Sequence, residues 1–128
     1  MAILLDTHSA LWYSLGDSQL SATARTAIET ESQARYVSPA SYWELAIKIR
    51  MGRYSLKVPF VAFWHEAIQR CGFSILEIKI NHASRVCDLP MVHRDPFDRM
   101  LVAQALCEGL PLVSNDLLLD GYKITRIW

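Results

Sequence analysis

The chain has 128 residues, of which 52% are apolar and 20% are charged, and its 13 basic residues balance 13 acidic ones. This length and composition fit one folded domain over residues 1–128 and exclude a disordered or fibrous protein. The neutral balance argues against a protein that holds nucleic acid by charge alone, but it is compatible with a local basic groove beside an acidic site.

Two further features bear on where the protein works. Asp6 interrupts the only apolar run near the N-terminus, so we expect no secretory signal, and no apolar run approaches the length of a membrane span. Cys71, Cys87 and Cys107 are far apart and form no Cys-x-x-Cys pair, which is typical of reduced thiols. We therefore expect a cytoplasmic protein without a membrane segment.

Apolar runs and helical patterns alternate along the chain. The short apolar runs predict strands over residues 2–5, 36–38, 73–78 and 112–113, with an edge strand near 124–127. The longer segments predict helices over 9–15, 21–31, 41–51, 60–71, 81–87 and 96–108. This alternation predicts a three-layer α/β/α fold in which helices cover both faces of a mainly parallel sheet.

Several of these helices begin with a residue suited to cap them. Asp6 and Ser21 precede the first two helices, and Asn81 precedes the fifth. Ser41 opens the third helix and has the spacing of a capping box with Glu44. By this pattern, Glu44 is most simply a capping residue.

The sixth helix has a tightly constrained start. Asp95 is a good N-cap, Pro96 suits the first helical position, and Asp98 lies in the first turn, where the helix dipole and unpaired N–H groups favour a carboxylate. By itself this Asp-Pro-x-Asp pattern is most simply a capping device. A role in chemistry requires other acids to converge on the same helix start.

Three other acids occupy matching positions in the predicted fold. Asp6, Glu44 and Asp116 follow strands, or open the helices after them, on the side of the sheet where the strands end. Four such carboxylates, with Asp98, repel one another unless a cation lies among them. Since these positions carry neither Cys nor His, the set favours Mg²⁺ or Mn²⁺ over Zn²⁺. Such a cation binds phosphate oxygens and lowers the pKa of a bound water.

Several motifs together carry a family resemblance. They are Leu4 to His8 with Leu11-Trp12, Val37 to Lys48, Leu89-Pro90 with His93 to Arg99, and Leu112 to Asp116 with Trp128. With these motifs the chain resembles the PIN-domain ribonucleases, and specifically the VapC-type toxins of bacterial and archaeal toxin–antitoxin pairs. The resemblance runs nearly from end to end and implies a PIN-like fold. The chain departs from the family pattern after Asp116, where leucines stand in place of an aromatic residue that is frequent in the family.

The resemblance implies a metal-dependent endoribonuclease that uses Mg²⁺ or Mn²⁺, with an RNA substrate, a cognate antitoxin and a homodimer as its partners. Asp6, Glu44, Asp98 and Asp116 match the acidic quartet of the family. Asp6 and Asp98 are the candidates for direct metal contact. Glu44 and Asp116 are expected to bind through water, to hold a second ion or to orient the attacking water. Asp95 is assigned as the N-cap, with membership of the site as the alternative.

Other residues are candidates for supporting roles. Ser114 stands where the family often carries Thr or Ser, and its hydroxyl is expected to support a metal-binding carboxylate. The histidines lack the spacing of a metal finger and receive no role. The large aromatic residues are expected in the core, with a groove for an antitoxin helix or a dimer seam as the alternative; they are Trp12, Tyr13, Trp43 and Phe60.

Basic residues near the acids are candidates for holding a phosphate backbone, namely Lys48, Arg50, Arg53, Arg94 and Arg99. The alternative is that they are solvated charges or partners of the acids. Lys48, for example, has the i,i+4 spacing for an ion pair with Glu44. Arg94 and Arg99 are favoured for function because they flank Asp98.

Three other classes of protein compete with this interpretation. A receiver domain needs a pair of acids after the first strand, but here Asp6 is followed by Thr7 and His8. It also needs a Lys after the last parallel strand, but here Ser114 is followed by Asn115. A haloacid-dehalogenase-type phosphatase needs Asp-x-Asp after its first strand, and position 8 is again His8. A catalytically silent PIN module that binds only RNA or a partner stays open, although the complete acidic quartet counts against it.

Overall fold

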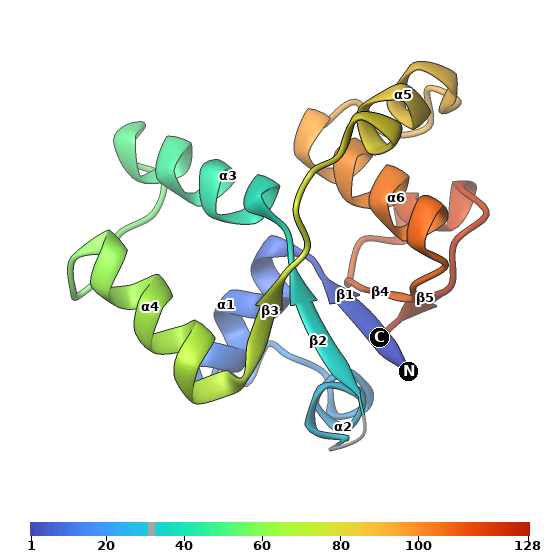
Figure 1. The fold of residues 1–128 in the computed structure, drawn as a ribbon. Coiled ribbons are helices and arrows are strands. Elements are labelled where there is room, and N and C mark those ends of the chain that lie inside the picture. Colours follow the sequence, from blue (N-terminus) through green and yellow to red (C-terminus); the bar gives the residue numbers. More distant parts are fainter. Residues whose placement is uncertain (31–32) are drawn as a thin grey trace.

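The computed structural model describes residues 1–30 and 33–128. Its centre is a five-stranded parallel sheet in the order β3-β2-β1-β4-β5 (Figure 1). The strands are β1 (Ala2–Leu5), β2 (Ala34–Val37), β3 (Phe73–Ile75), β4 (Leu112–Val113) and β5 (Arg126–Ile127). The predicted parallel sheet is confirmed. Strand β3 is shorter than predicted and ends at Ile75, although the Leu76 N–H still donates to the Val37 carbonyl.

Helices follow the strands as the alternation predicts. They are α1 (Thr7–Leu15), α2 (Ala22–Glu29), α3 (Pro39–Arg50), α4 (Phe60–Cys71), α5 (Ile80–Asp88) and α6 (Pro96–Glu108), with a 3₁₀ helix η1 (Leu117–Gly121) after β4. The predicted end of the second helix, Glu31, lies outside the described residues. None of the helices in the described ranges is both long enough and apolar enough to cross a bilayer.

The start of α3 differs from the prediction. The Ser38 hydroxyl accepts from the Ala40 N–H at 3.1 Å, and Pro39 occupies the first turn. Proline has no N–H to satisfy and a φ angle already suited to a helix, so the helix begins before Ser41. The predicted capping box of Ser41 and Glu44 is therefore wrong.

The start of α5 also differs. The predicted cap was Asn81, but the helix begins at Ile80. The buried His82 ring reaches back, and its Nδ1 accepts from the Lys79 N–H at 3.0 Å. The predicted caps Asp6 and Ser21 are confirmed, since each accepts from a backbone N–H in its own first turn.

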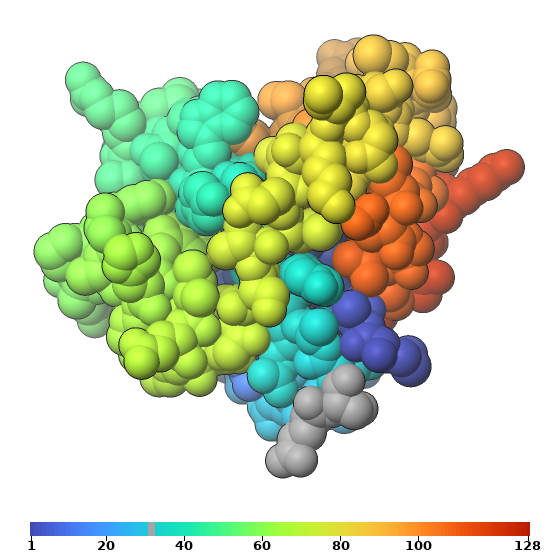
Figure 2. Space-filling view, in the orientation of Figure 1, coloured from blue at the N-terminus to red at the C-terminus, as the bar shows by residue number. Residues whose placement is uncertain are grey.

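Alternating side chains of β1 divide the core into two layers. Ile3 and Leu5 face a cluster formed with α1, α2, α3 and α4, whereas Leu4 faces a second cluster formed mainly with α6. Burial of these apolar faces is what holds the helices on the sheet. The segment after β3 runs across the front of the molecule from the region of α4 to α5 (Figure 2).

The strand order creates a switch point beside β1. From β1 the chain adds β2 and β3 on one side, and then adds β4 and β5 on the other. In open parallel sheets a crevice forms at such a point, beyond the carboxyl ends of the two strands. Here these ends are Leu5 and Val113, which are register partners. The fold thus brings the residues after β1 and after β4 together.

Candidate active site

An acidic pocket of about 440 Å³ lies at this switch point. All four acids of the predicted quartet line it. The residues of the acidic pocket are Asp6, Thr7, His8, Glu44, Lys48, His93, Asp95, Asp98, Asn115, Asp116 and Leu117. They come from the segments after β1 and β4, with the first residues of α1 and η1, and from the helices α3 and α6 with the loop before α6. The pocket is therefore assembled by tertiary packing.

Asp6 is the most buried aspartate of the pocket, with 6% of its surface exposed. Its Oδ1 accepts from the Ser9 N–H at 2.8 Å. Burial raises the pKa of Asp6, and hydrogen bonds from the Ser114 and Ser9 side chains oppose that rise. The Ser114 hydroxyl also accepts from the Asp116 N–H at 3.1 Å. Ser114 therefore links the acids at the ends of β1 and β4, which is the kind of support expected of it.

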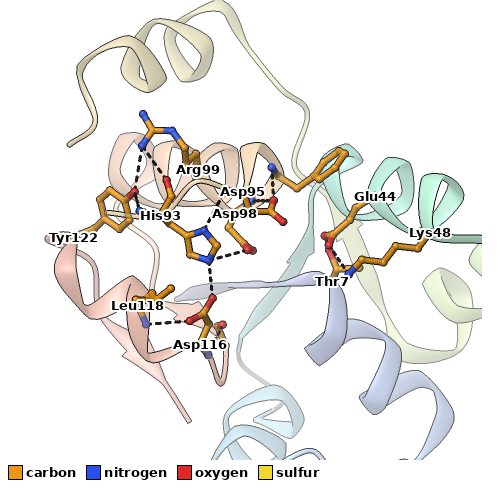
Figure 3. Close-up of polar contacts among 12 residues, drawn as sticks. Thr7, Glu44, Lys48, His93, Asp95, Asp98, Arg99, Asp116, Leu118 and Tyr122 are labelled. Carbon is orange, nitrogen blue, oxygen red and sulfur yellow. Dashed lines mark hydrogen bonds and ion pairs between the residues drawn. The ribbon is translucent and has the colours of Figure 1, made fainter. Parts of the chain in front are cut away.

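Glu44 approaches the pocket from α3 and is 5% exposed. Its Oε1 accepts from the Thr7 hydroxyl at 2.5 Å, and its Oε2 lies 2.9 Å from the Lys48 ammonium (Figure 3). The predicted pair with Lys48 is confirmed. Thr7 received no role from the sequence, because its contact with Glu44 joins residues 37 positions apart.

Asp95 and Asp98 enter from the start of α6. The Asp95 Oδ1 accepts from the N–H groups of Phe97 and Asp98 at 2.8 and 3.1 Å, which confirms Asp95 as the N-cap. Burial raises the pKa of Asp98 to about 7, and the charge of Asp95 acts in the same direction. The charges of Asp6 and Glu44 raise it further, whereas His93 opposes the rise. The acids are thus close enough to act on one another's ionisation.

His93 lies between two of these acids. Its Nε2 is 2.7 Å from Asp116 Oδ2 and 3.3 Å from Asp98 Oδ2 (Figure 3). Each of the three residues offers an atom within 4.8 Å of the others, a spacing at which they could surround one ion. The expectation that the four histidines have no role is therefore wrong for His93. Its position in an irregular loop gives no periodic signal, and the sequence pointed to it only through the motif His93 to Arg99, which carries the family resemblance.

The five predicted basic residues differ in where they lie. Lys48 lines the acidic pocket, while Arg94 is exposed and lines a neighbouring groove. Arg50 and Arg53 are exposed and line neither cavity, so their predicted role in holding a phosphate backbone gains no support from their positions. Arg99 is 9% exposed, and its guanidinium donates to the carbonyls of Val86, Leu89, Pro90 and His93 and to the Tyr122 hydroxyl. Figure 3 shows Arg99 pointing away from Asp98. The expectation that Arg99 holds substrate phosphate is therefore not supported by its contacts.

The composition of the acidic pocket suits a divalent cation. Among its described lining residues, five are carboxylic acids and Lys48 is the only Lys or Arg. Partly buried carboxylates repel one another, and a hard cation relieves that repulsion while accepting oxygen ligands. Asp6, Glu44, Asp98 and Asp116 line the pocket and could supply these oxygens, whereas the fifth acid, Asp95, uses its Oδ1 to cap α6.

A second cavity, the apolar groove, adjoins the start of α6. It has a volume of about 460 Å³, and its lining includes Trp43, Ile78, Met91, Arg94, Phe97 and Met100. The Trp43 side chain is 62% exposed, and its ring packs edge-on against Phe97 at 5.2 Å between centroids. Of the four aromatic residues considered from the sequence, Trp12, Tyr13 and Phe60 pack against the core and Trp43 lines this groove.

The fold and the acidic pocket define a class of protein. A family model described as the PIN domain matches residues 3–123, and the chain belongs to this family. Among known proteins it is similar to Ribonuclease VapC22 from Mycobacterium tuberculosis (strain ATCC 25618 / H37Rv). The two chains are 30% identical over 125 residues, which cover 97% of this chain and 94% of that one.

Solved structures share the same fold at lower identity. VapBC2 from Rickettsia felis, bound to a DNA fragment from its promoter, has a TM-score of 0.73 and 12% identity, covering 98% of this chain and 97% of that chain. VapBC-1 from nontypeable Haemophilus influenzae has a TM-score of 0.64 and 14% identity, covering 98% of this chain and 96% of that chain. The PIN-like α/β architecture expected from the sequence is thereby confirmed.

Proposed function

We propose that this protein is a divalent-metal-dependent endoribonuclease that acts as the toxin of a toxin–antitoxin pair. The observation that carries the proposal is the convergence of Asp6, Glu44, Asp98 and Asp116 on one pocket at the switch point of the sheet. Similarity to Ribonuclease VapC22 over nearly the whole chain supports RNA as the substrate. We assign Mg²⁺ or Mn²⁺ as the cofactor because the candidate ligands are carboxylate oxygens.

The acids are proposed to have different roles in holding the cation. Asp6 and Asp98 are proposed to hold the cation directly, since both are partly desolvated and their pKa values are raised in the metal-free protein. Glu44 is held by Thr7 and Lys48, which leaves its carboxylate oriented toward the pocket. When bound, the cation neutralises phosphate charge and lowers the pKa of a water that attacks phosphorus. Lys48, 32% exposed at its side chain, is suited to hold a phosphate of the RNA backbone.

The test is RNA cleavage by the full chain, purified free of any antitoxin. We expect structured RNAs to be cut with Mg²⁺ or Mn²⁺ and to stay intact in EDTA. Asp98→Asn should abolish cleavage, whereas Asp88→Asn, an exposed acid at the end of α5 outside the pocket, should leave it unchanged. Cleavage that persists in EDTA or in Asp98→Asn would overturn the mechanism. RNA that is bound but not cut would favour a silent binding module.

A cellular test addresses the toxin role. Expression of the wild-type chain should arrest growth, and Asp6→Asn should relieve the arrest at equal protein levels. Normal growth with the wild-type chain would count against a toxin. Sequencing the new RNA ends after induction identifies the substrate, because selectivity among transfer, ribosomal and messenger RNA depends on RNA shape and unpaired bases.

We propose the apolar groove as the docking site of the antitoxin. The exposed Trp43 and the half-buried Phe97 offer an apolar surface at the start of α6. Arg94 at the same groove suits an acidic side chain of an apolar helix. Similar folds have been solved as VapBC assemblies. Co-expression with small proteins encoded beside this gene should yield a complex that Trp43→Ser weakens. A complex unaffected by Trp43→Ser would place the antitoxin elsewhere. We also propose a homodimer, which sedimentation of the isolated chain tests.

A further inference from the structure

The ring of His93 joins acids from two separate elements. Asp98 belongs to the first turn of α6, and Asp116 precedes η1 after β4. The His93 side chain is 12% exposed and its Nε2 faces Oδ2 of both acids, at 3.3 and 2.7 Å. The other oxygen of Asp116, Oδ1, accepts from the Leu118 N–H at 3.0 Å. His93 therefore bridges these two carboxylates.

The opposite ring nitrogen reveals which nitrogen carries the proton. Nδ1 accepts a hydrogen bond from the backbone N–H of Asp95 at 3.1 Å (Figure 3). A ring nitrogen that accepts a hydrogen bond presents its lone pair, so the proton of the neutral ring is on Nε2. Nε2–H then points at the carboxylates as a donor. Asp95 thus caps α6 with its side chain and fixes the His93 tautomer with its main chain.

We infer that His93 is a positioning residue, whose Nε2–H clamps the Asp98 and Asp116 carboxylates, and that it is not itself a metal ligand. This inference rests on the proposed function of the acidic pocket. A histidine that binds a metal usually donates its other ring N–H to a carbonyl or carboxylate. In His93 the other nitrogen faces an N–H donor instead. The ligand set therefore stays all-oxygen, although a nitrogen lies within 4.8 Å of the Asp98 and Asp116 ligand atoms.

The loop that carries His93 is held rigidly for this task. The His93 N–H donates to the Tyr122 hydroxyl at 2.9 Å, and the His93 carbonyl accepts from Arg99. Arg99 also binds the Tyr122 hydroxyl and the carbonyl of Pro90, so one buried cation fixes both ends of the loop. Fixed backbone on both sides of the ring leaves it little freedom to rotate. The buried Arg99 thus supports the pocket through His93 and not through the substrate.

Nitrogen NMR of the histidine rings tests the tautomer in the full-length, metal-free protein. At pH 8, where an ordinary imidazole is neutral, we expect the single ring proton of His93 to be on Nε2 and to stay there when Mg²⁺ is added. Its signals are assigned by their loss in His93→Gln, with His65→Gln on the exposed face of α4 as the matched control. A proton on Nδ1, or loss of the Nε2 proton on adding Mg²⁺, would overturn the inference.

Mn²⁺ affinity measured by calorimetry separates a donor from a ligand. The amide nitrogen of Gln can replace the Nε2–H donor, so His93→Gln should bind Mn²⁺ within about threefold of wild type. His93→Ala removes the donor and should weaken binding about 10- to 100-fold, as loss of an outer hydrogen-bond partner does at other metal sites. Equal losses in both variants would overturn the inference. Neither measurement uses RNA, so a failure to cleave RNA would contradict the proposed function without changing these outcomes.

Discussion

Ionisation of Asp98 is unfavourable in the acidic pocket. Burial is the largest cause of its raised pKa of about 7, followed by the charge of Asp95. In the unfolded chain the carboxyl titrates near 3.8. At pH values between these two pKa values, the Asp98 carboxyl is mostly protonated in the folded state and mostly ionised in the unfolded state. The contribution of Asp98 to the free energy of unfolding therefore falls as the pH rises from about 4 to about 7.

Asp98→Asn removes this titration. In EDTA at pH 8 we expect the variant to exceed the wild type in stability by on the order of 2–4 kcal/mol, and by much less at pH 4.5. Urea unfolding at the two pH values measures the difference. Asp88→Asn should show no comparable dependence on pH. A gap between Asp98→Asn and wild type that is the same at both pH values would contradict the assigned pKa.

Thr7 supports the pocket through one buried hydrogen bond to Glu44. Thr7→Val keeps the shape of the side chain but leaves Glu44 Oε1 without this donor, so we expect a loss of about 1–3 kcal/mol in unfolding free energy. Thr30→Val removes an exposed hydroxyl that bonds the Thr26 carbonyl and serves as the control. Chemical denaturation of the three proteins gives the comparison, and equal effects of the two substitutions would argue against a special role for Thr7.

At the level of elements, the two serines at the start of α3 can be told apart. Ser38 caps the helix through the Ala40 N–H, whereas the buried Ser41 hydroxyl has no hydrogen-bond partner within residues 1–30 and 33–128. We expect Ser38→Ala to cost about 1 kcal/mol, because a capped N–H is lost. Ser41→Ala should be neutral or slightly stabilising, because it removes an unpaired polar group. Thermal unfolding measures both, and a larger cost for Ser41→Ala would restore the predicted capping box.

Local sequence signals predict the starts of some of these helices and not of others. The start of α6 was predictable because Asp95, Pro96 and the first-turn acid agree with one another. At α3 two signals competed, and the proline at the first turn prevailed over the capping box. At α5 the His82 ring accepts from the N–H of Lys79, the residue before the helix, and histidine is not among the usual capping residues. Helix η1 was missed because its three leucines, 117–119, follow Asp116 without a helical period.

At the level of the molecule, the convergence of the acids could be predicted but the contacts between them could not. Parallel strands place their carboxyl ends at one edge, so acids following them were expected to meet. The strand order that pairs β1 with β4, and so Asp6 with Ser114, depends on packing of the whole sheet. His93 and Arg99 owe their positions to a loop fixed by Tyr122, nearly 30 residues further on in the chain.

The whole fold should respond to the cation that the pocket is proposed to bind. A ligand that binds only the folded state stabilises it by mass action, by about 2.7 kcal/mol at 100 times its dissociation constant. We therefore expect millimolar Mn²⁺ at pH 7.5 to raise the Tm of the wild-type chain, and EDTA to reverse the rise. The gain should be larger at pH 8 than at pH 5.5, where protons compete for Asp98. Asp6→Asn should lose most of the gain while Asp88→Asn keeps it. An equal Mn²⁺ response in all three chains would mean that the ion binds outside the acidic pocket.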